Sequence, residues 1–220
     1  MANDPASETH CPLCGNAGVS RYWRGDRREF LRCGECSLVF VPARYFLSGE
    51  AEKQRYDLHR NAPHDEGYRS FLERLFAPMN RVITPNSEGL DFGSGPVPVL
   101  SGMFEDARHR MTRYDRFYAP DAAALERQYD FIVACEVAEH LREPGTELER
   151  IWSCLRHGGR LGIMTQLLLV PDAFPAWHYK NDLTHICFYA PGTFAWLAKH
   201  WGGSLTFPDR DVAVFHKHSN

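Results

Sequence analysis

The chain has 220 residues, 44% of them hydrophobic, and its 25 basic and 28 acidic residues give a net charge of -3. This length fits one main domain with a small appendage, and the slightly negative charge excludes a broad electrostatic attraction for nucleic acid. At its start the sequence shows no basic region followed by an apolar run, as a secretory signal would, and it contains no apolar run of membrane-spanning length. We therefore expect a cytoplasmic protein that has no membrane partner.

Two C-x2-C pairs lie near the amino terminus, Cys11 with Cys14 and Cys33 with Cys36, and 18 residues separate them. Two such thiolates bind one ion from a tight turn, and four of them make a closed tetrahedral zinc site. Because so short a segment cannot build a sufficient core by itself, the metal would supply most of its folding energy. Residues 1–45 are thus predicted to be a zinc-ribbon module with a structural zinc ion.

Several arginines alternate with aromatic residues between the two cysteine pairs, as in the hairpin of a zinc ribbon: Arg21, Arg24, Arg27, Arg28 and Arg32. These side chains could form a basic patch for RNA. A solvated face of the hairpin is the commoner explanation of such a pattern.

Residues 46–84 are predicted to be a helical linker or lid. The stretch YRSFLERLFAPMNRVI has the apolar spacing of an amphipathic helix that packs on the main domain. Upstream, a group of polar and aromatic residues has no clear period and fits either a lid over a pocket or a plain polar loop: Tyr56, His59, Asn61, His64, Asp65 and Tyr68.

Residues 85–220 alternate strand and helix patterns, which is typical of a parallel α/β sheet. Strands are expected at 88–93, 110–115, 129–137 and 160–168, helices after the turn at 93–95 and at 144–159 and 191–202, and a closing hairpin at 204–207 and 212–217. The predicted fold is a Rossmann-like, mostly parallel sheet with an antiparallel carboxyl-terminal hairpin, in addition to the small zinc ribbon.

Ligands of such sheets bind at the carboxyl ends of the strands, where the strand order reverses. Asp91, Asp115 and Glu136 fall at that edge. The turn Gly93-Ser94-Gly95 lets backbone N–H groups approach a ligand, and an acidic residue that ends the second strand can accept both hydroxyls of a ribose. Val97 stands where a dinucleotide fingerprint has its third glycine, and we expect it to pack under the sheet.

The order LDFGSGP, YD, YDFIVACEVAEHL and LRHGGRLGIMT resembles the class I S-adenosylmethionine-dependent methyltransferases over roughly residues 88–217. The cofactor of that family has no pyrophosphate, so the missing third glycine is tolerable. The resemblance implies a methionine, ribose and amino-acid contact set for S-adenosylmethionine: Asp91, Gly93, Gly95, Asp115, Cys135 and Glu136. Only 14 residues separate Asp115 from Asp130, where the family usually fits a helix, a third strand and a loop that contacts adenine.

A second cluster surrounds the CEVAEHL stretch. Glu136, Glu139 and His140 form E-x-x-E-H at the predicted mouth of the cofactor site, and a later loop adds His178 and His185. The three histidines are candidate catalytic bases or substrate-orienting groups. A similar motif binds a divalent ion in small-RNA 2′-O-methyltransferases and in ubiquinone-pathway O-methyltransferases. By that resemblance the alternative is an ion held by Glu136, Glu139, His140 and His185, and a purely structural role for the histidines also stays open.

These patterns predict an enzyme that transfers a methyl group from S-adenosylmethionine to an oxygen or nitrogen of a small-molecule acceptor. Aromatic residues after the fourth strand could shape the acceptor pocket, although at least half of them should be ordinary core: Phe174, Trp177, Tyr179, Phe188 and Tyr189. One alternative is an RNA methyltransferase that uses the ribbon for recognition, and the negative net charge makes nucleic acid the less favoured partner. The other is a non-catalytic scaffold that has kept the cofactor-binding fold.

Overall fold

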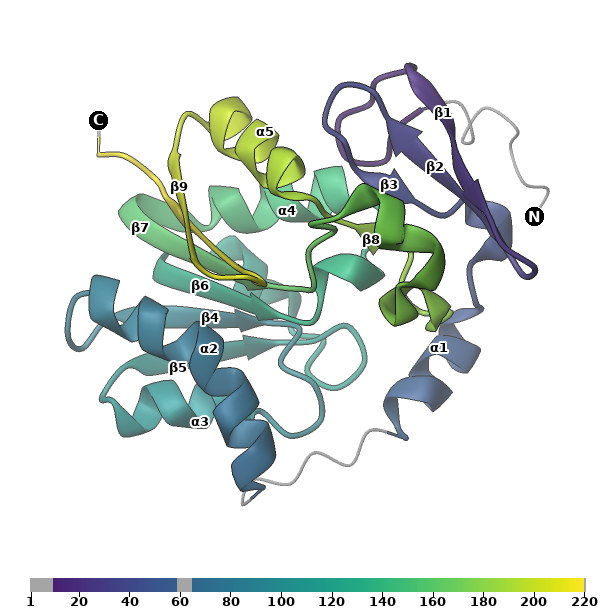
Figure 1. The fold of residues 1–220 in the computed structure, drawn as a ribbon. Helices are drawn as coiled ribbons and strands as arrows, with labels where there is room; N and C mark the ends of the chain where they lie inside the picture. The colour runs from purple at the N-terminus through teal and green to yellow at the C-terminus, as the bar shows by residue number, and fades with distance from the viewer. Residues whose placement is uncertain (1–9, 59–64, 220) are drawn as a thin grey trace.

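A computed structural model describes residues 10–58 and 65–219 of the chain, which form two β-sheets with helices around them (Figure 1). The larger sheet has the order β5-β4-β6-β7-β10-β9. Its strands are β4 (Glu88–Phe92), β5 (Arg110–Tyr114), β6 (Tyr129–Cys135), β7 (Leu155–Met164), β9 (Ser204–Asp209) and β10 (Val212–His216). Strands β5, β4, β6 and β7 are parallel, whereas β10 runs antiparallel to both β7 and β9. The predicted Rossmann-like sheet with an antiparallel hairpin is confirmed.

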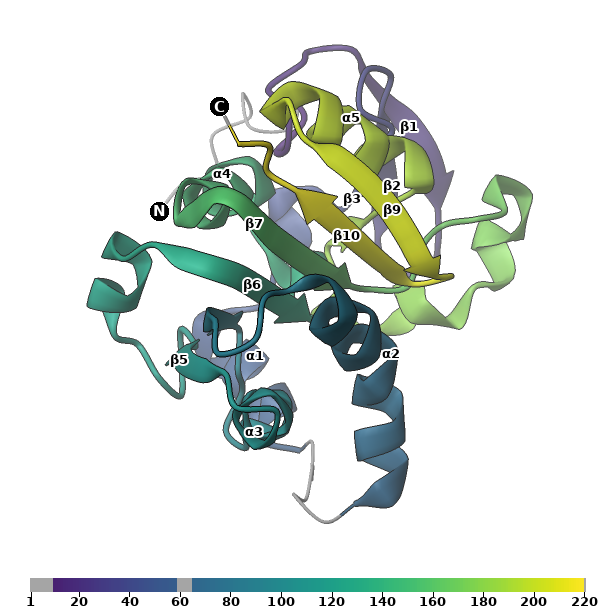
Figure 2. The same ribbon diagram turned by 90° about the vertical axis from the view of Figure 1, so that its left-hand side faces the viewer.

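Helices cover both faces of this sheet, as Figure 2 shows. They are α2 (Glu66–Val82) and α3 (Val99–Asp106) on one face, and α4 (Pro144–Ser153) and α5 (Pro191–Trp201) on the other. Strand β6 supplies both cores by simple alternation: Phe131 and Val133 pack with the α2 and α3 side, and Ile132 and Ala134 with the α4 and α5 side. A strand buried on both faces explains the continuous apolar run FIVAC at residues 131–135.

The short stretch after β5 carries only the 3-10 helix η3 (Ala122–Glu126), so β5 is the edge strand of the sheet. This is the consequence of the 14-residue spacing between Asp115 and Asp130. Strand β7 begins earlier than predicted, at Leu155, which pairs with Tyr129 before a register shift in the β6–β7 ladder.

The smaller sheet has the order β1-β2-β3-β8. Strands β1 (Val19–Arg24) and β2 (Glu29–Cys33) form the predicted hairpin, and β3 (Val39–Phe40) follows. Its last strand, β8 (Cys187–Phe188), comes from far along the chain, because Val39 pairs with Phe188 and Phe40 with Cys187. We call β1, β2, β3 and β8 the N-terminal sheet. The division at residue 45 stays a prediction about folding units, while in space the two parts share one hydrophobic core.

The segment between the sheets contains η2 (Ala43–Tyr45), α1 (Gly49–Tyr56) and α2. The α2 helix begins after Asp65, whose side chain accepts a hydrogen bond from the N–H of Tyr68, and it buries Leu72, Leu75 and Met79, as its amphipathic pattern predicts. His59, Asn61 and His64 of the predicted lid lie outside the described residues. Three further 3-10 helices complete the described elements: η4 (Ala138–His140), η5 (Pro171–Ala176) and η6 (His178–Asn181).

Within residues 10–58 and 65–219, no helix combines the length and the apolar character that crossing a bilayer requires.

Phe174 of η5 anchors η5 to the N-terminal sheet: it is 1% exposed, and its ring lies 5.0 Å from that of Phe30 in β2 and 5.9 Å from that of Phe188 in β8. We expect Phe174→Ala to lower the free energy of unfolding by about 3–5 kcal/mol, because it leaves a cavity between tightly packed rings. Phe207→Ala is the matched control, because that ring is 41% exposed. Urea denaturation of both variants tests this, and equal losses would contradict the anchoring role of Phe174.

Candidate active site

A cavity of about 330 Å3 opens at the carboxyl ends of β4, β5 and β6. The chain runs from β4 to β5 on one side and then crosses to β6 on the other, so the strand order reverses at this point, where α/β sheets bind their ligands. The cavity is lined by the turn after β4, residues 114–118 and the end of β6, and by Asp182, Thr184 and His185. Residues of α1, α2, η4 and α4 also contribute to the wall.

The glycine turn after β4 approaches β6 closely. Gly93 has a φ of 79°, and a Cβ atom there would lie 2.3 Å from Cγ2 of Val137. Gly93 also donates its N–H to the carbonyl of Tyr114 at 2.7 Å. Only glycine combines this backbone conformation with so close a neighbour. The turn therefore lies directly against the ends of β5 and β6.

Asp115 is fixed at the cavity wall by backbone N–H groups. Its Oδ2 accepts from Gly95 at 3.0 Å, and its Oδ1 accepts from Phe117 at 2.8 Å and from Tyr118 at 3.0 Å. A carboxylate has about four lone-pair positions, so capacity for further donors remains. This geometry holds Asp115 in one orientation toward the cavity.

Two residues of the predicted cofactor turn differ in how they relate to the cavity. Asp91 does not line the cavity: it is 3% exposed, accepts a hydrogen bond from Ser101 at 2.7 Å, and burial raises its pKa to about 6. Val97 is half-buried and packs against the core on the α2 and α3 side of the sheet, as expected, and it also lines the cavity, because α3 begins only at Val99. Asp91 thus ties β4 to α3 and lies behind the turn.

Cys135 and Glu136 form the cavity wall at the end of β6. Glu136 has a φ of 51°, a left-handed conformation that is costly for a residue with a side chain, and its N–H donates to Met164 at 2.8 Å. Burial and then the nearby Glu139 raise the pKa of Glu136 to about 9. Burial likewise raises the pKa of the Cys135 thiol. Burial therefore favours the neutral form of both side chains.

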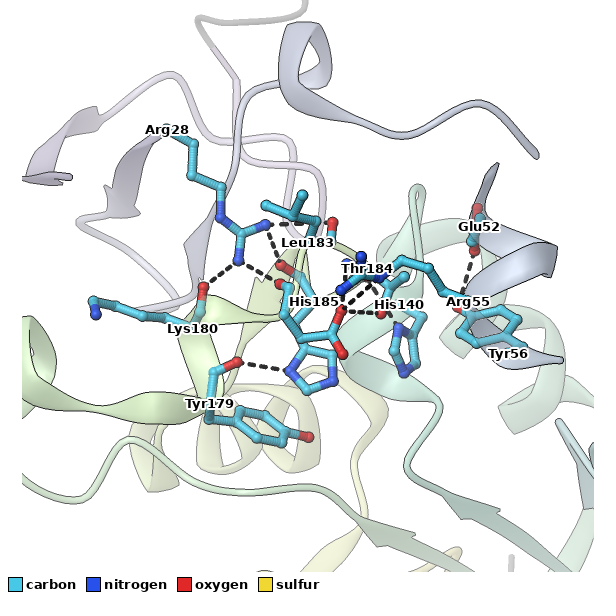
Figure 3. A network of polar contacts seen from close by, with 11 residues as sticks. Arg28, Glu52, Arg55, Tyr56, His140, Tyr179, Lys180, Leu183, Thr184 and His185 are labelled. Carbon is cyan, nitrogen blue, oxygen red and sulfur yellow. Dashed lines mark hydrogen bonds and ion pairs between the residues drawn. The ribbon is translucent and has the colours of Figure 1, made fainter. Parts of the chain in front are cut away.

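His140 and His185 both line the cavity, and their rings lie 4.9 Å apart (Figure 3). Nδ1 of His140 lies 3.0 Å from the carbonyl of Thr184, and Nδ1 of His185 lies 2.8 Å from the carbonyl of Tyr179. Because a carbonyl only accepts, each Nδ1 carries a proton, and in a neutral ring Nε2 then carries the lone pair. Burial lowers the pKa of His185, which favours that neutral form.

Glu139 lies beneath the two histidines and is fully buried. Its Oε1 accepts from the hydroxyl of Tyr179, and its Oε2 has no hydrogen-bond partner among the described residues. One ligand atom from each of Glu139, His140 and His185 lies within 4.8 Å of the others, so these three side chains form a possible donor set for an ion. Glu136 of the predicted ion site is not part of this group.

Several predicted site residues stay outside the cavity. His178 is exposed at the start of η6. The prediction of an aromatic acceptor pocket is wrong, because none of the five aromatic residues between Phe174 and Tyr189 lines the cavity. They belong to the main hydrophobic core or pack against it instead, and Phe174 and Phe188 contact Phe30 of the N-terminal sheet. Rings that are buried in this core cannot also line the cavity.

The structure adds wall residues that the sequence did not mark. Tyr56 belongs to the predicted lid, but its neighbour Glu52 was missed. Glu52 is 4% exposed and accepts hydrogen bonds from Tyr56 at 3.0 Å and from Arg142 at 2.8 Å. Its stretch GEAEKQRY is polar throughout, so no periodicity could have identified its buried position. Arg116, Phe117 and Glu147 also line the cavity.

The four amino-terminal cysteines lie together, as their spacing predicted. The Sγ atoms of Cys11 and Cys36 are 3.5 Å apart, those of Cys14 and Cys33 are also 3.5 Å apart, and all four lie within 4.8 Å of one another. Of the five arginines between them, Arg28 is not available for a surface patch, because it is 5% exposed.

The fold is shared with solved structures, two of which are named methyltransferases. At 13% identity and a TM-score of 0.54, it is similar to the PH0226 protein from Pyrococcus horikoshii OT3, with 76% of this chain and 99% of that chain covered. The mitomycin 7-O-methyltransferase gives 13% identity and a TM-score of 0.50, with 71% and 59% covered. The 1,6-didemethyltoxoflavin-N1-methyltransferase of Burkholderia thailandensis, solved with S-adenosylhomocysteine, gives 14% identity and a TM-score of 0.48, with 91% and 100% covered.

No curated protein matches the chain. Residues 57–204, however, match the family described as methyltransferase domain, and this range contains the glycine turn, Asp115 and both cavity histidines. The chain therefore belongs to the methyltransferase-domain family and is an S-adenosylmethionine-dependent methyltransferase.

Proposed function

We propose that the enzyme transfers a methyl group to an oxygen or nitrogen of a small-molecule acceptor inside the cavity. The observation that carries this proposal is that a single cavity joins the Gly93 to Gly95 turn and Asp115 to the rings of His140 and His185. Its volume of about 330 Å3 is at the low end of small-molecule sites, which span about 300–1,000 Å3.

The residues around the turn fit the cofactor. A Cβ atom at Gly95 would meet no other atom within 4 Å, so bare backbone faces open space there. Asp115 beside it offers the carboxylate that ribose hydroxyls require. When bound, S-adenosylmethionine supplies a methyl carbon on a positively charged sulfur. Gly93, Gly95, Asp115, Cys135 and Glu136 would hold it, and Asp91 would act from behind by fixing the turn.

Methyl transfer is an in-line displacement, so the protein mainly aligns the reacting atoms and excludes water. The acceptor's lone pair forms the new bond to carbon, the bond between sulfur and carbon breaks with its electron pair on sulfur, and the acceptor loses a proton. His140 and His185 are suited to receive that proton, because Nε2 of each neutral ring carries a lone pair. Tyr56, Tyr68 and Phe71 line the cavity and reduce its access to water.

The same histidines support a second arrangement. The unpartnered Oε2 of the buried Glu139, together with Nε2 of His140 and His185, would suit a divalent ion that orients the acceptor. A histidine lone pair that binds an ion cannot accept a proton at the same time, so each Nε2 has only one of these two roles. The dependence of the rate on added metal therefore distinguishes them.

We further propose that Cys11, Cys14, Cys33 and Cys36 bind one structural zinc ion. Four thiolates would leave no open coordination position for an acceptor. The close spacing of their Sγ atoms fits this role.

Transfer of a tritium-labelled methyl group to a panel of small hydroxyl and amine compounds tests the proposed function, with total tRNA as a comparison. We expect label in a small compound and none in tRNA. Asp115→Ala should weaken binding of S-adenosylhomocysteine by about 10–100-fold in calorimetry, because charged hydrogen bonds contribute about 1.5–3 kcal/mol. The exposed Asp26→Ala should bind as wild type does. Label that appears only in tRNA would refute the small-molecule acceptor.

His185→Gln should lower kcat with the acceptor found in that panel by about 100-fold, because the proton acceptor is lost. In the wild type, burial lowers the pKa of His185, and the neighbouring His140 lowers it further. Glu139 and Asp182 act in the opposite direction, but the net effect is a lowered pKa. The neutral ring thus persists below its ordinary value of about 6.5, and the rate should fall only at more acidic pH.

His178→Gln is the matched control and should leave the rate unchanged, because His178 is exposed outside the cavity. A rate that vanishes after dialysis against a chelator and returns with Mg2+ or Mn2+ would instead assign Glu139, His140 and His185 to an ion. Cysteine sites do not favour these hard ions, so such a result would not reflect the amino-terminal cluster.

Elemental analysis should find about one zinc ion per chain, and Cys36→Ser should reduce that content and the midpoint of thermal unfolding. Cys154→Ser is the control, since Cys154 is buried elsewhere and donates to the carbonyl of Leu125. Wild-type protein without zinc and with a fully reactive set of four thiols would contradict the metal site.

A further inference from the structure

Arg28 is a buried cation in the turn between β1 and β2. It is 5% exposed, whereas its neighbours Asp26 and Arg27 are exposed. Burial lowers its pKa to about 10, so the guanidinium is still charged at pH 7. A buried charge is costly unless hydrogen bonds compensate it. The position of Arg28 therefore depends on what accepts its N–H groups.

Its acceptors are backbone carbonyls of one short segment, as Figure 3 shows. Nη1 donates to His185 at 2.9 Å and to Leu183 at 3.4 Å, and Nη2 donates to Asp182 at 2.6 Å and to Lys180. We call residues 180–185 the active-site loop. It contains no strand and only the end of η6, so its carbonyls have few partners in regular structure.

The active-site loop bears on the orientation of both cavity histidines. Its Thr184 carbonyl accepts from Nδ1 of His140 at 3.0 Å, and it carries His185, whose Nδ1 lies 2.8 Å from the carbonyl of Tyr179 directly before the loop. Within the loop, the carboxylate of Asp182 accepts two hydrogen bonds from Thr184, one from its N–H at 2.9 Å and one from its hydroxyl at 2.8 Å. Arg28 does not line the cavity. It touches the site only through these carbonyls.

We infer that Arg28 is a positioning residue of the active site: by gathering the carbonyls of the active-site loop, it keeps Nε2 of His140 and His185 directed at the acceptor. The inference rests on the proposed role of these histidines as proton acceptors. It also gives the N-terminal sheet a task in catalysis, as a brace for the active-site loop.

Two further contacts join the same hairpin to this part of the chain. Nζ of Lys180 lies 4.8 Å from the ring centre of Trp23, and the hydroxyl of Tyr22 donates to the carbonyl of Pro171 at 3.0 Å. The hairpin therefore contacts the polypeptide before and within the active-site loop. Arg28 is the contact that reaches the backbone beside the histidines.

The planar guanidinium is essential to this arrangement. Arginine presents five N–H donors in a rigid fork, whereas the ammonium of lysine is a point charge with three donors. Arg28→Lys keeps the charge but cannot reach all four carbonyls at once. Arg28→Met keeps most of the apolar stem and removes every donor. Arg27→Met is the matched control, one residue away in the same turn and exposed.

The test uses nitrogen NMR of the histidine rings in full-length protein saturated with S-adenosylhomocysteine. In the wild type and in Arg27→Met, His140 and His185 should each show a protonated Nδ1 and an unprotonated Nε2. In Arg28→Met this pattern should be lost, and kcat with the identified acceptor should fall by about 10–100-fold, because small displacements of catalytic groups have effects of this size. The affinity for S-adenosylhomocysteine should change less than about twofold, and Arg28→Lys should lie between.

Unchanged histidine signals in Arg28→Met would overturn the inference, even if the rate fell. A loss of S-adenosylhomocysteine binding that parallels the loss of rate would also overturn it, because it would indicate a general structural defect. If Arg28→Met does not fold, the same signals in Arg28→Lys decide. If the signals change but His185→Gln keeps the full rate, the positioning role of Arg28 stands and the proton-acceptor proposal fails.

Discussion

The pairing of β4 with β6 determines where the cavity lies. Because β5 occupies the other side of β4, the chain must cross over to reach β6, and the two connections leave the sheet in opposite directions at its carboxyl edge. The space between them is the cavity. Gly93 is the residue on which this depends, since any side chain there would collide with Val137 at the end of β6. Gly93 thereby allows the glycine turn and the acidic end of β6 to lie next to each other.

Elements with a strong local pattern were predictable, and so were groups whose chemistry depends on short spacing. The parallel strands, the hairpin at the carboxyl terminus and the convergence of the four cysteines follow from periodicity and from C-x2-C geometry. The motif E-x-x-E-H likewise indicated a cluster, of which Glu139 and His140 meet His185. Each of these signals lies within a few residues of sequence.

The remaining parts of the site depend on contacts between distant segments, which one sequence does not reveal. His178 and His185 looked equivalent in the stretch WHYKNDLTHICFY, yet only the second lines the cavity, because Arg28 gathers the backbone between them. The aromatic residues of the same stretch are part of the main hydrophobic core or pack against it. Glu52 became a wall residue through Arg142, which lies 90 positions later in the chain.

The late position of β8 in the sequence affects how the N-terminal sheet folds during translation. Strand β8, which covers the edge of β3, is translated long after the first three strands. At typical synthesis rates of about 5–20 residues per second, the edge of β3 stays unpaired for on the order of ten seconds before β8 is synthesised. An uncovered strand edge invites pairing with other chains. Early capture of a metal ion by the cysteines would hold the nascent hairpin compact during this interval, so metal supply and translation speed together would govern the yield of folded enzyme.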